Sequence, residues 1–399
     1  MYKELDASVA PGQAEARLQR GLSIIKLLYF FFYAGLGVFI AFLNVYYQSI
    51  GLSGTQIGLI NTFGPLVGIF GTTLWGMVSD RFGKIRLLLV FASLGVILAV
   101  TGLSAAQTFL WILLIACFFS LFHSAIFPLL DSTTLSLLGD RRERYGYYRV
   151  WGTIGFIVTS LLAGLVYQRF GLRVMFPAYT VVILAFLVAS LGLPNQPIRL
   201  GGSLLYGMNQ MIRKSAWIIF AASVLLLWVA ASGTMAFLSI TIKAMGGGEV
   251  LIGMAWTIAA LVEAPVILLS GALLHRFGAA RLLGISFIGY TLRTLLYALM
   301  PSPNWVLGIN LLHCVSYVPF WIGAVAYAND LAPDNLKATS QGMLFSIMSL
   351  ASVGGAMLSG LLYDSIGPPG LFKVLTGFCC AALLLFWTGR FTLSSGGGA

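Results

Sequence analysis

The feature that most constrains this chain is a series of apolar segments, each long enough to cross a lipid bilayer. A spanning helix needs about 20 consecutive residues that are mostly apolar. Segments of this kind lie near 22–49, 55–78, 86–106, 108–138, 146–168, 172–193, 215–243, 250–274, 280–300, 304–330, 336–363 and 370–391. They leave room for little else, so we expect an all-α membrane protein with twelve transmembrane helices.

The composition makes lipid the solvent of this chain. Hydrophobic residues make up 59% of the sequence and charged residues 9%. A water-soluble fold would need polar faces to cover that much apolar surface, and the long uncharged segments do not provide them. A net charge of +11 would suggest nucleic acid in a soluble protein. Here the basic residues gather in short loops, so we expect a bilayer and no nucleic acid as partner.

A polar connector divides the chain into two groups of six segments. We expect an N-terminal six-helix bundle over 22–194, a cytoplasmic linker over 195–214 and a C-terminal six-helix bundle over 215–391. Residues 1–21 lack the apolar stretch and cleavage site of a secretory signal, so they are interpreted as a cytoplasmic tail. Residues 392–399 are expected to form a flexible tail.

Lysine and arginine residues in short loops predict how the chain is oriented across the membrane. The loops that follow the second, fourth and eighth segments are basic: Arg81, Lys84, Arg86, Arg141, Arg142, Arg144, Arg276 and Arg281. Because basic loops stay in the cytoplasm, both termini should be cytoplasmic. We expect a multi-pass protein of the plasma membrane, the inner or cytoplasmic membrane of a prokaryote.

The two halves of the chain repeat one another. The stretch 76–89 aligns with 271–284 at an offset of 195, which matches Gly76 with Gly271 and Arg81 with Arg276. An offset of 196 matches four later positions, Gly146, Gly164, Tyr167 and Gly171, with Gly342, Gly360, Tyr363 and Gly367. A duplicated six-helix unit explains both matches.

The repeated stretch resembles the signature loop of the major facilitator superfamily. The matching residues of the first copy are Gly76, Asp80, Arg81, Gly83 and Arg86, and those of the second are Gly271, Arg276 and Gly278. The resemblance implies two pseudo-symmetric six-helix bundles around a central cavity, with alternating access. It also implies that this loop is a gating motif that holds the cytoplasmic side closed. His275 stands where the first copy has Asp80, a departure from the motif.

Within the superfamily the chain resembles the branch of the lactose and phenylpropionate permeases. The stretches that carry this resemblance are 128–131, 145–152, 262–265 and 312–314. It implies substrate-binding roles for Arg149, Phe156 and Arg293, and proton-coupling roles for Asp131 and His313. Asn310 and Ser316 stand where lactose permease has a lysine and a glutamate, and Glu263 lies about one turn from that permease's acid. The substrate stays open between sugars, nucleosides and aromatic carboxylates.

Ionisable residues far from helix ends are the strongest site candidates, because each costs several kcal/mol in hydrocarbon unless paired or hydrated. Glu263 and Arg293 lie 15 residues on either side of Gly278, which places them at similar depth and predicts a pair, direct or through water. The same reasoning pairs Asp131 with Arg149. Glu263 is our main candidate for the proton carrier, and Asp131 is its rival. The structural alternatives are a packing ion pair and, for Arg149, snorkelling to the headgroups.

One face of the tenth segment combines a histidine with aromatic residues. Tyr317 and Trp321 follow His313 at i+4 and i+8, so the three share a helix face. We expect this face to line the cavity, although a packing histidine in an aromatic core is the simpler alternative. Asn310 and Trp256 complete the expected substrate-binding set. The aromatic cluster 29–33 is interpreted as an interfacial belt, with a solute-binding platform as the alternative.

These candidate residues favour a transporter as the function class. The sequence has no phosphate-binding loop, no Ser/His/Asp ordering and no zinc spacing, so we expect neither an enzyme nor an ATP-driven pump, and no cofactor or metal. The favoured function is proton-coupled symport of a small organic solute by a monomer. A proton-antiport exporter of drugs or lipids is the alternative, and a non-transporting receptor is a third.

Overall fold

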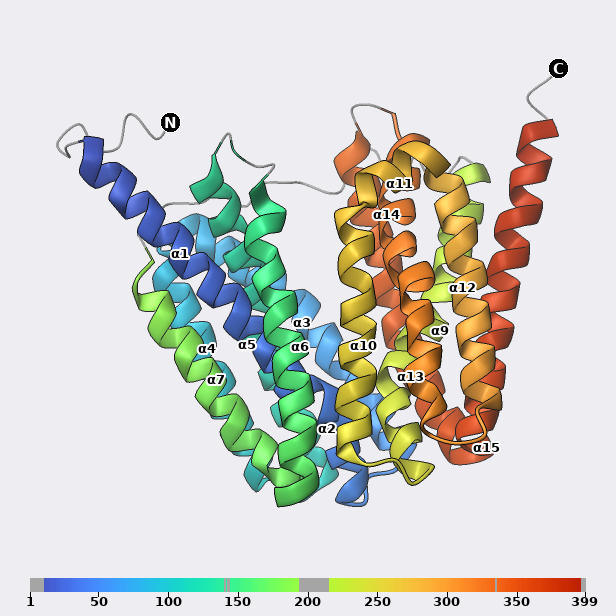
Figure 1. Ribbon diagram of the computed structural model, residues 1–399, viewed down its shortest axis with the longest axis horizontal. Coiled ribbons are helices and arrows are strands. Elements are labelled where there is room, and N and C mark those ends of the chain that lie inside the picture. Colours follow the sequence, from blue (N-terminus) through green and yellow to red (C-terminus); the bar gives the residue numbers. More distant parts are fainter. Residues whose placement is uncertain (1–10, 140, 142–143, 194–214, 334–335, 396–399) are drawn as a thin grey trace.

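The computed structural model describes residues 11–139, 141, 144–193, 215–333 and 336–395. Within these ranges every regular element is helical (Figure 1). The linker expected at 195–214, residues 1–10 and residues 396–399 lie outside the described residues.

The first half holds six spans. α1 (Pro11–Gly35), the π turn η1 (Leu36–Ile40) and α2 (Ala41–Ser49) form the first. Four long helices follow, α3 (Gly54–Phe82), α4 (Ile85–Ala105), α5 (Phe109–Leu138) and α6 (Tyr145–Phe170). A short 3-10 turn, η3 (Leu172–Val174), then leads into α7 (Met175–Leu191).

The second half begins with α9 (Ser215–Ala244) and continues through α10 (Glu249–Leu268), the short α11 (Ser270–Phe277) and α12 (Ala279–Leu299). α13 (Trp305–Ile309), η4 (Asn310–Leu312) and α14 (His313–Leu331) form the next span, and α15 (Lys337–Ser395) ends the described chain. In the described residues, eleven helices are long and apolar enough to cross a membrane.

The last of these eleven contains two spans. α15 is interrupted at Gly367, where φ is 69° and ψ is 177°. This conformation favours glycine, and Pro368 and Pro369 follow it, as is common at the start of a new helix. With this break counted, the expected twelve-helix membrane fold is confirmed.

Helix ends differ from the apolar segments in three places. α1 begins at Pro11, inside the expected tail, because loss of apolar character does not by itself end a helix and Pro is favoured in a first turn. α15 continues to Ser395, because polar residues do not by themselves end a helix. The expected helix 250–274 breaks at Leu269, directly after a turn that contains Pro265.

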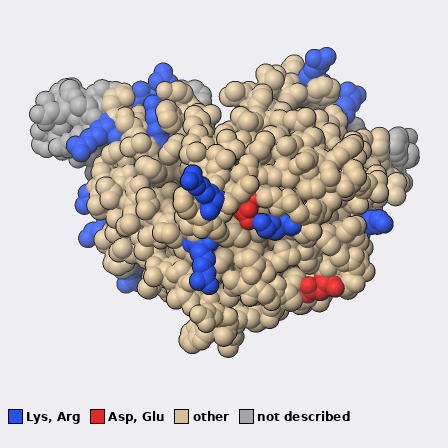
Figure 2. Space-filling model, turned by 60° about the horizontal axis from the view of Figure 1, so that its bottom comes forward, with Lys and Arg blue, Asp and Glu red and all other residues tan. Residues whose placement is uncertain are grey.

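The two halves meet at one end and separate toward the other. In Figure 1 the first turns of α1 and the last turns of α15 lie at the top; we call that end the terminal face and the opposite end the distal face. Between the halves, α3 packs on α15 and α6 packs on α10. In Figure 2 a notch separates the two bundles at the upper edge.

Hydrogen bonds between the halves gather near the distal face in the described residues. The pairs are Asn44 with Ala236, Gln48 with Tyr363, Gly54 and Thr55 with Asp364, Thr62 with Val353, Ser160 with Gly253, Gln168 with Val250, and, farther from that face, Thr257 with Ile157. The distal face is therefore closed in this structure.

Glycines allow the closed end to pack backbone against backbone. A Cβ on Gly58 of α3 would lie 2.8 Å from the Ala356 carbonyl oxygen of α15. A Cβ on Gly164 of α6 would lie 2.7 Å from the Glu249 carbonyl oxygen of α10. The repeat offsets relate these two crossings, since Gly164 aligns with Gly360, which packs on Gly54 of α3.

The outer surface suits a bilayer. Large apolar side chains are exposed around the bundle, among them Phe70 at 74% and Leu268 at 81%. Figure 2 shows mostly uncharged surface with scattered basic side chains and few acidic ones. Such an apolar exterior would be unfavourable in water and is expected of a lipid-facing one.

Candidate functional site

Three helices of the second half bring Glu263, Arg293 and His313 together. Glu263 lies on α10, Arg293 on α12 and His313 at the start of α14, and these helices pack on one another. Nδ1 of His313 lies 2.6 Å from Oε1 of Glu263, a close contact whose angles fall outside those of a regular hydrogen bond. Arg293 is only 2% exposed and interacts electrostatically with both groups.

The pair of Glu263 with Arg293, expected to be direct or through water, is not a direct ion pair among the described residues. Nη1 of Arg293 donates to Oγ of Ser316 at 2.8 Å, and its guanidinium lies 4.8 Å from the Tyr290 ring centroid. Glu263 instead contacts His313. Counting residues from Gly278 gave the common depth of the pair, but not the direction in which each helix turns its side chain. A cluster of three ionisable groups replaces the expected pair.

The first half has a second cluster in which tyrosines replace the expected ion pair. Oδ1 of Asp131, on α5, accepts hydrogen bonds from Tyr29 of α1 at 2.7 Å and Tyr145 of α6 at 2.6 Å. Arg149, on α6, donates to the Tyr33 hydroxyl of α1. Its guanidinium lies 5.2 Å from the ring centroids of both Tyr33 and Phe127. Asp131 and Arg149 are not partners in any ion pair of the described residues.

The two clusters approach each other across the interface between the halves. Tyr317 of α14 interacts electrostatically with Glu263 of its own half and with Tyr33 and Arg149 of the other. Its ring centroid lies 5.3 Å from that of His313. Tyr317 therefore lies within electrostatic range of both clusters.

Aromatic rings extend the site along α14. Trp321 lies 6.2 Å from Tyr317 and 5.5 Å from Trp228 of α9, measured between ring centroids. Trp256 donates to Oγ of Ser239 at 2.9 Å, and Phe156 is half-buried on α6. Sequence reasoning missed Trp228, although the offset of 195 aligns it with Tyr33. It also interpreted 29–33 as an interfacial belt, whereas Tyr29 and Tyr33 bind the site's acid and arginine.

Asn310 occupies a structural position instead. Its amide accepts a hydrogen bond from the Tyr297 hydroxyl and donates to the Ala255 carbonyl at 2.6 Å, and the residue is 1% exposed. Both ends of the amide are engaged by the protein. We do not carry Asn310 into the proposed substrate site.

The expected gating motif lies at the terminal face. Gly76 and Arg81 belong to the end of α3, Gly83 caps it with a φ of 61°, and Nη1 of Arg86 donates to the Leu191 carbonyl at 3.3 Å. The side chain of Asp80 lies outside the described part of the chain. In the second copy, Gly271 and Arg276 belong to α11, and Gly278 has a φ of 73°. The gating role of both copies stays a prediction.

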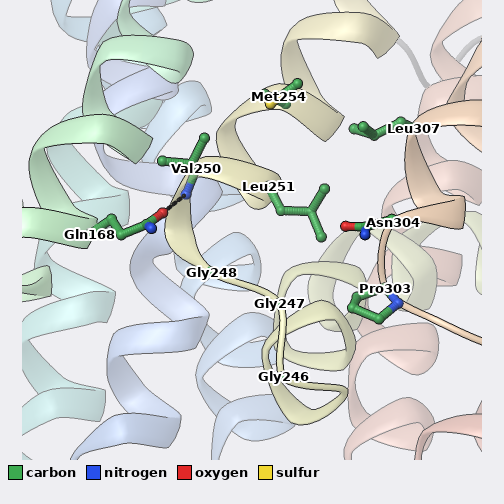
Figure 3. A pocket seen from close by; sticks show the side chains of 10 residues that line it. All are labelled: Gln168, Gly246, Gly247, Gly248, Val250, Leu251, Met254, Pro303, Asn304 and Leu307. Carbon is green, nitrogen blue, oxygen red and sulfur yellow. Dashed lines mark hydrogen bonds between the residues drawn. The ribbon is translucent and has the colours of Figure 1, made fainter.

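The described residues contain no group of three or more His, Cys, Asp or Glu side chains that could hold a metal ion. The depression in Figure 3 has a volume of about 460 Å³ and lies at the distal face. Gln168, the loop 246–248 and Asn304 line it. None of the residues that line it belongs to the two ionisable clusters, so the site between the halves is a separate feature.

Two six-helix halves, closed at one end, with facing clusters of ionisable and aromatic side chains, form the architecture of a secondary membrane transporter. Sequence comparison agrees. The profile of the MFS_1 like family matches residues 22–374, and the chain belongs to this family of major facilitator transporters, which are not enzymes.

Relatives named as transporters support the same class. Maltose permease of Geobacillus stearothermophilus is 28% identical over 333 residues, covering 82% of this chain and 83% of that protein. The "Probable 3-phenylpropionic acid transporter" of Escherichia coli K12 is 27% identical over 379 residues, covering 90% and 96%. The crystal structure of the nucleoside transporter NupG has a TM-score of 0.81 at 18% identity, covering 93% of this chain and 98% of that one. The last likeness concerns the fold alone.

Proposed function

We propose that this transporter is a proton-coupled symporter of a small organic solute, working by alternating access across the cytoplasmic membrane of a prokaryote. The observation that carries the proposal is the contact of Glu263 with His313 beside Arg293. A carboxylate that exchanges partners as the halves move can bind a proton on one side and release it on the other. His313 is placed to receive or return that proton.

The charge balance of the two clusters favours a carboxylate as solute. With His313 neutral and the other groups ionised, the acids Asp131 and Glu263 balance Arg149 and Arg293. Protonation of Glu263 leaves one arginine uncompensated, and an anionic solute restores neutrality. Proton and solute then favour each other's binding, and this mutual preference is what couples them.

The lining of the site favours an aromatic or other unsaturated body for that solute. Tyr33 and Phe127 lie against the guanidinium of Arg149, and Trp321 lies beside Tyr317. An aromatic carboxylate fits this combination better than a sugar or a nucleoside. The relative named as a 3-phenylpropionic acid transporter supports this choice.

The basic loops predict that the terminal face is cytoplasmic, with both termini on that side. The closed distal face would then be the outer one, and the structure would represent an inward-facing arrangement. We expect the protein to act as a monomer.

The proposal is tested in proteoliposomes with an imposed pH gradient and labelled 3-phenylpropionate, maltose or uridine outside. We expect uptake of the carboxylate, with accumulation of up to about tenfold per pH unit for one proton per solute, since tenfold corresponds to about 1.4 kcal/mol. Proton-driven efflux of the same solute would identify an antiport exporter instead. Absence of any flux across a broad solute panel would favour a receptor.

The proton site is tested by Glu263→Gln, which keeps the size and hydrogen bonding of the protonated acid but cannot titrate. We expect solute exchange without a gradient to persist and gradient-driven accumulation to be lost. Asp131→Asn is the matched control in the first half. Normal accumulation by Glu263→Gln, together with loss in Asp131→Asn, would move the proton site to Asp131.

A further inference from the structure

At the distal face, a carboxylate of one half caps the first turn of a helix in the other. Oδ1 of Asp364, on α15, accepts from the backbone N–H of Gly54 at 2.7 Å. Oδ2 accepts from the backbone N–H of Thr55 at 2.7 Å and from its hydroxyl at 2.6 Å. Both carboxylate oxygens of Asp364 are therefore used at the start of α3.

α3 is prepared for this partner by its own first turn. Ser53 and Gln56 form a capping box, in which Oγ of Ser53 accepts from the Gln56 N–H and Oε1 of Gln56 accepts from the Ser53 N–H. This box leaves the N–H groups of Gly54 and Thr55 for an outside acceptor. A Cβ at position 54 would lie 2.7 Å from Oδ1 of Asp364, so only glycine leaves room for the carboxylate.

The interface of α6 with α10 has a similar cap across the halves, but the capping side chain is neutral. Oε1 of Gln168, on α6, accepts from the Val250 N–H in the first turn of α10 at 3.3 Å. The offset of 196 aligns Gln168 with Asp364, and the offset of 195 aligns Thr55 with Val250. The structure therefore contains two equivalent caps, each reaching across the halves.

Charge at the second helix explains why the two caps differ. α10 begins with Glu249, which already places a carboxylate in its first turn and pairs with Lys243 at 2.6 Å. α3 has no acidic residue in its first turn. A carboxylate near a helix N-terminus is stabilised by the helix dipole, and a second one beside Glu249 would be repelled. Asp364 places a carboxylate at the N-terminus of α3, as Glu249 does at the N-terminus of α10.

We infer that Asp364 is the charged residue of a distal gate, which holds this face closed by capping α3, with Gln168 as its neutral counterpart on α10. The inference rests on the proposed alternating access. Opening the distal face pulls α15 from α3 and exposes the Gly54 and Thr55 N–H groups to water. The capping box stays within α3, so the helix end survives opening and is ready to receive Asp364 again.

The gate is tested by distance measurement, which needs neither solute nor proton gradient. Spin labels at Gln107→Cys and Asn304→Cys, both exposed distal positions in different halves, report opening in a variant that lacks the four native cysteines. We expect Asp364→Ala to raise the ratio of open to closed distal face about tenfold, because three charge-assisted hydrogen bonds are lost. The near-isosteric Asp364→Asn should give a smaller shift.

Gln168→Ala is the matched control and should change the ratio by less than about threefold, because it removes one neutral hydrogen bond. An unchanged distance distribution in both Asp364 variants, or an equal shift in Gln168→Ala, would overturn the inference. Circular dichroism of each variant separates gating from misfolding. A shift in distances without any transport would leave the gate standing and contradict the proposed function.

Discussion

At the scale of residues, the planar guanidinium of Arg293 is expected to be essential for solute uptake. Arg293 donates from Nη1 to Ser316, its guanidinium lies 4.8 Å from the Tyr290 ring centroid, and its Nε has no hydrogen-bond partner among the described residues. A lysine keeps the charge but cannot reproduce this planar fork. We expect Arg293→Lys to reduce solute uptake by more than about tenfold, as one misplaced hydrogen-bonded charge costs about 1.5–3 kcal/mol.

The control for Arg293→Lys is Ser316→Ala, which removes the partner and leaves the guanidinium in place. It should cost about 1 kcal/mol, or a severalfold loss of uptake. Initial rates in proteoliposomes measure both. Wild-type uptake by Arg293→Lys would reduce Arg293 to a packing residue.

Sequence reasoning at this scale found the ionisable residues but not their partners. The sequence shows which apolar segments contain a charged residue, and how far that residue lies from the ends of its span. It does not show the rotation of each helix about its axis, which decides that Glu263 contacts His313 rather than Arg293. Tyr33 was assigned first to an interfacial belt, because an aromatic cluster near a helix start is typical of a membrane interface.

At the scale of elements, the contact of α1 with α6 positions the first-half cluster. Gly155 of α6 lies so close to the Phe30 carbonyl of α1 that an added methyl group would clash with it. We expect Gly155→Ala to lower the free energy of unfolding by about 1–3 kcal/mol, as overpacking does. It should also displace Tyr33 from Arg149 and weaken solute binding.

The same helix offers a control, because a Cβ on Gly146 would meet nothing within 4 Å. Gly146→Ala should be neutral or stabilising by up to about 1 kcal/mol, since alanine favours helices. Thermal unfolding in detergent compares the two variants. Equal melting temperatures would mean that the α1 and α6 contact is looser than described.

Apolar length predicted the helices well and their interruptions poorly. The break at Gly367 falls between the expected segments 336–363 and 370–391, but the break at Leu269 and the π turn at 36–40 lie inside apolar segments, where hydropathy does not mark them. Backbone conformation decides these breaks, and a single glycine or proline in such a stretch is compatible with a continuous helix as well.

At the scale of the whole molecule, the orientation in the membrane is the simplest expectation to check. Lys84 lies at the terminal face and Gln107 at the distal face, and both are exposed. Single cysteines at these positions, in a cysteine-free variant in intact cells, should react oppositely with an impermeant maleimide. We expect Gln107→Cys to be labelled from outside and Lys84→Cys only after permeabilisation. Labelling of both from outside would contradict the orientation.

The internal repeat predicted the two-bundle architecture, because a duplicated unit must fold twice in the same way. It could not predict which face is closed. That choice depends on a small difference in free energy between arrangements with much the same helices. It was therefore only in the structure that contacts such as Gln48 with Tyr363 became visible.

The paired glycine crossings bear on how such a chain could have arisen. Each half contributes one helix to each of the two crossings, α3 with α15 and α6 with α10. Two identical six-helix chains could therefore already have closed against each other as a parallel dimer. Any change in that ancestral gene would have altered both crossings at once. In a single fused chain the two copies can differ, and the second has Glu263 and Arg293 where the aligned positions of the first have Gly68 and Leu98. The backbone contacts of the seam remained alike while the chemistry of the halves diverged.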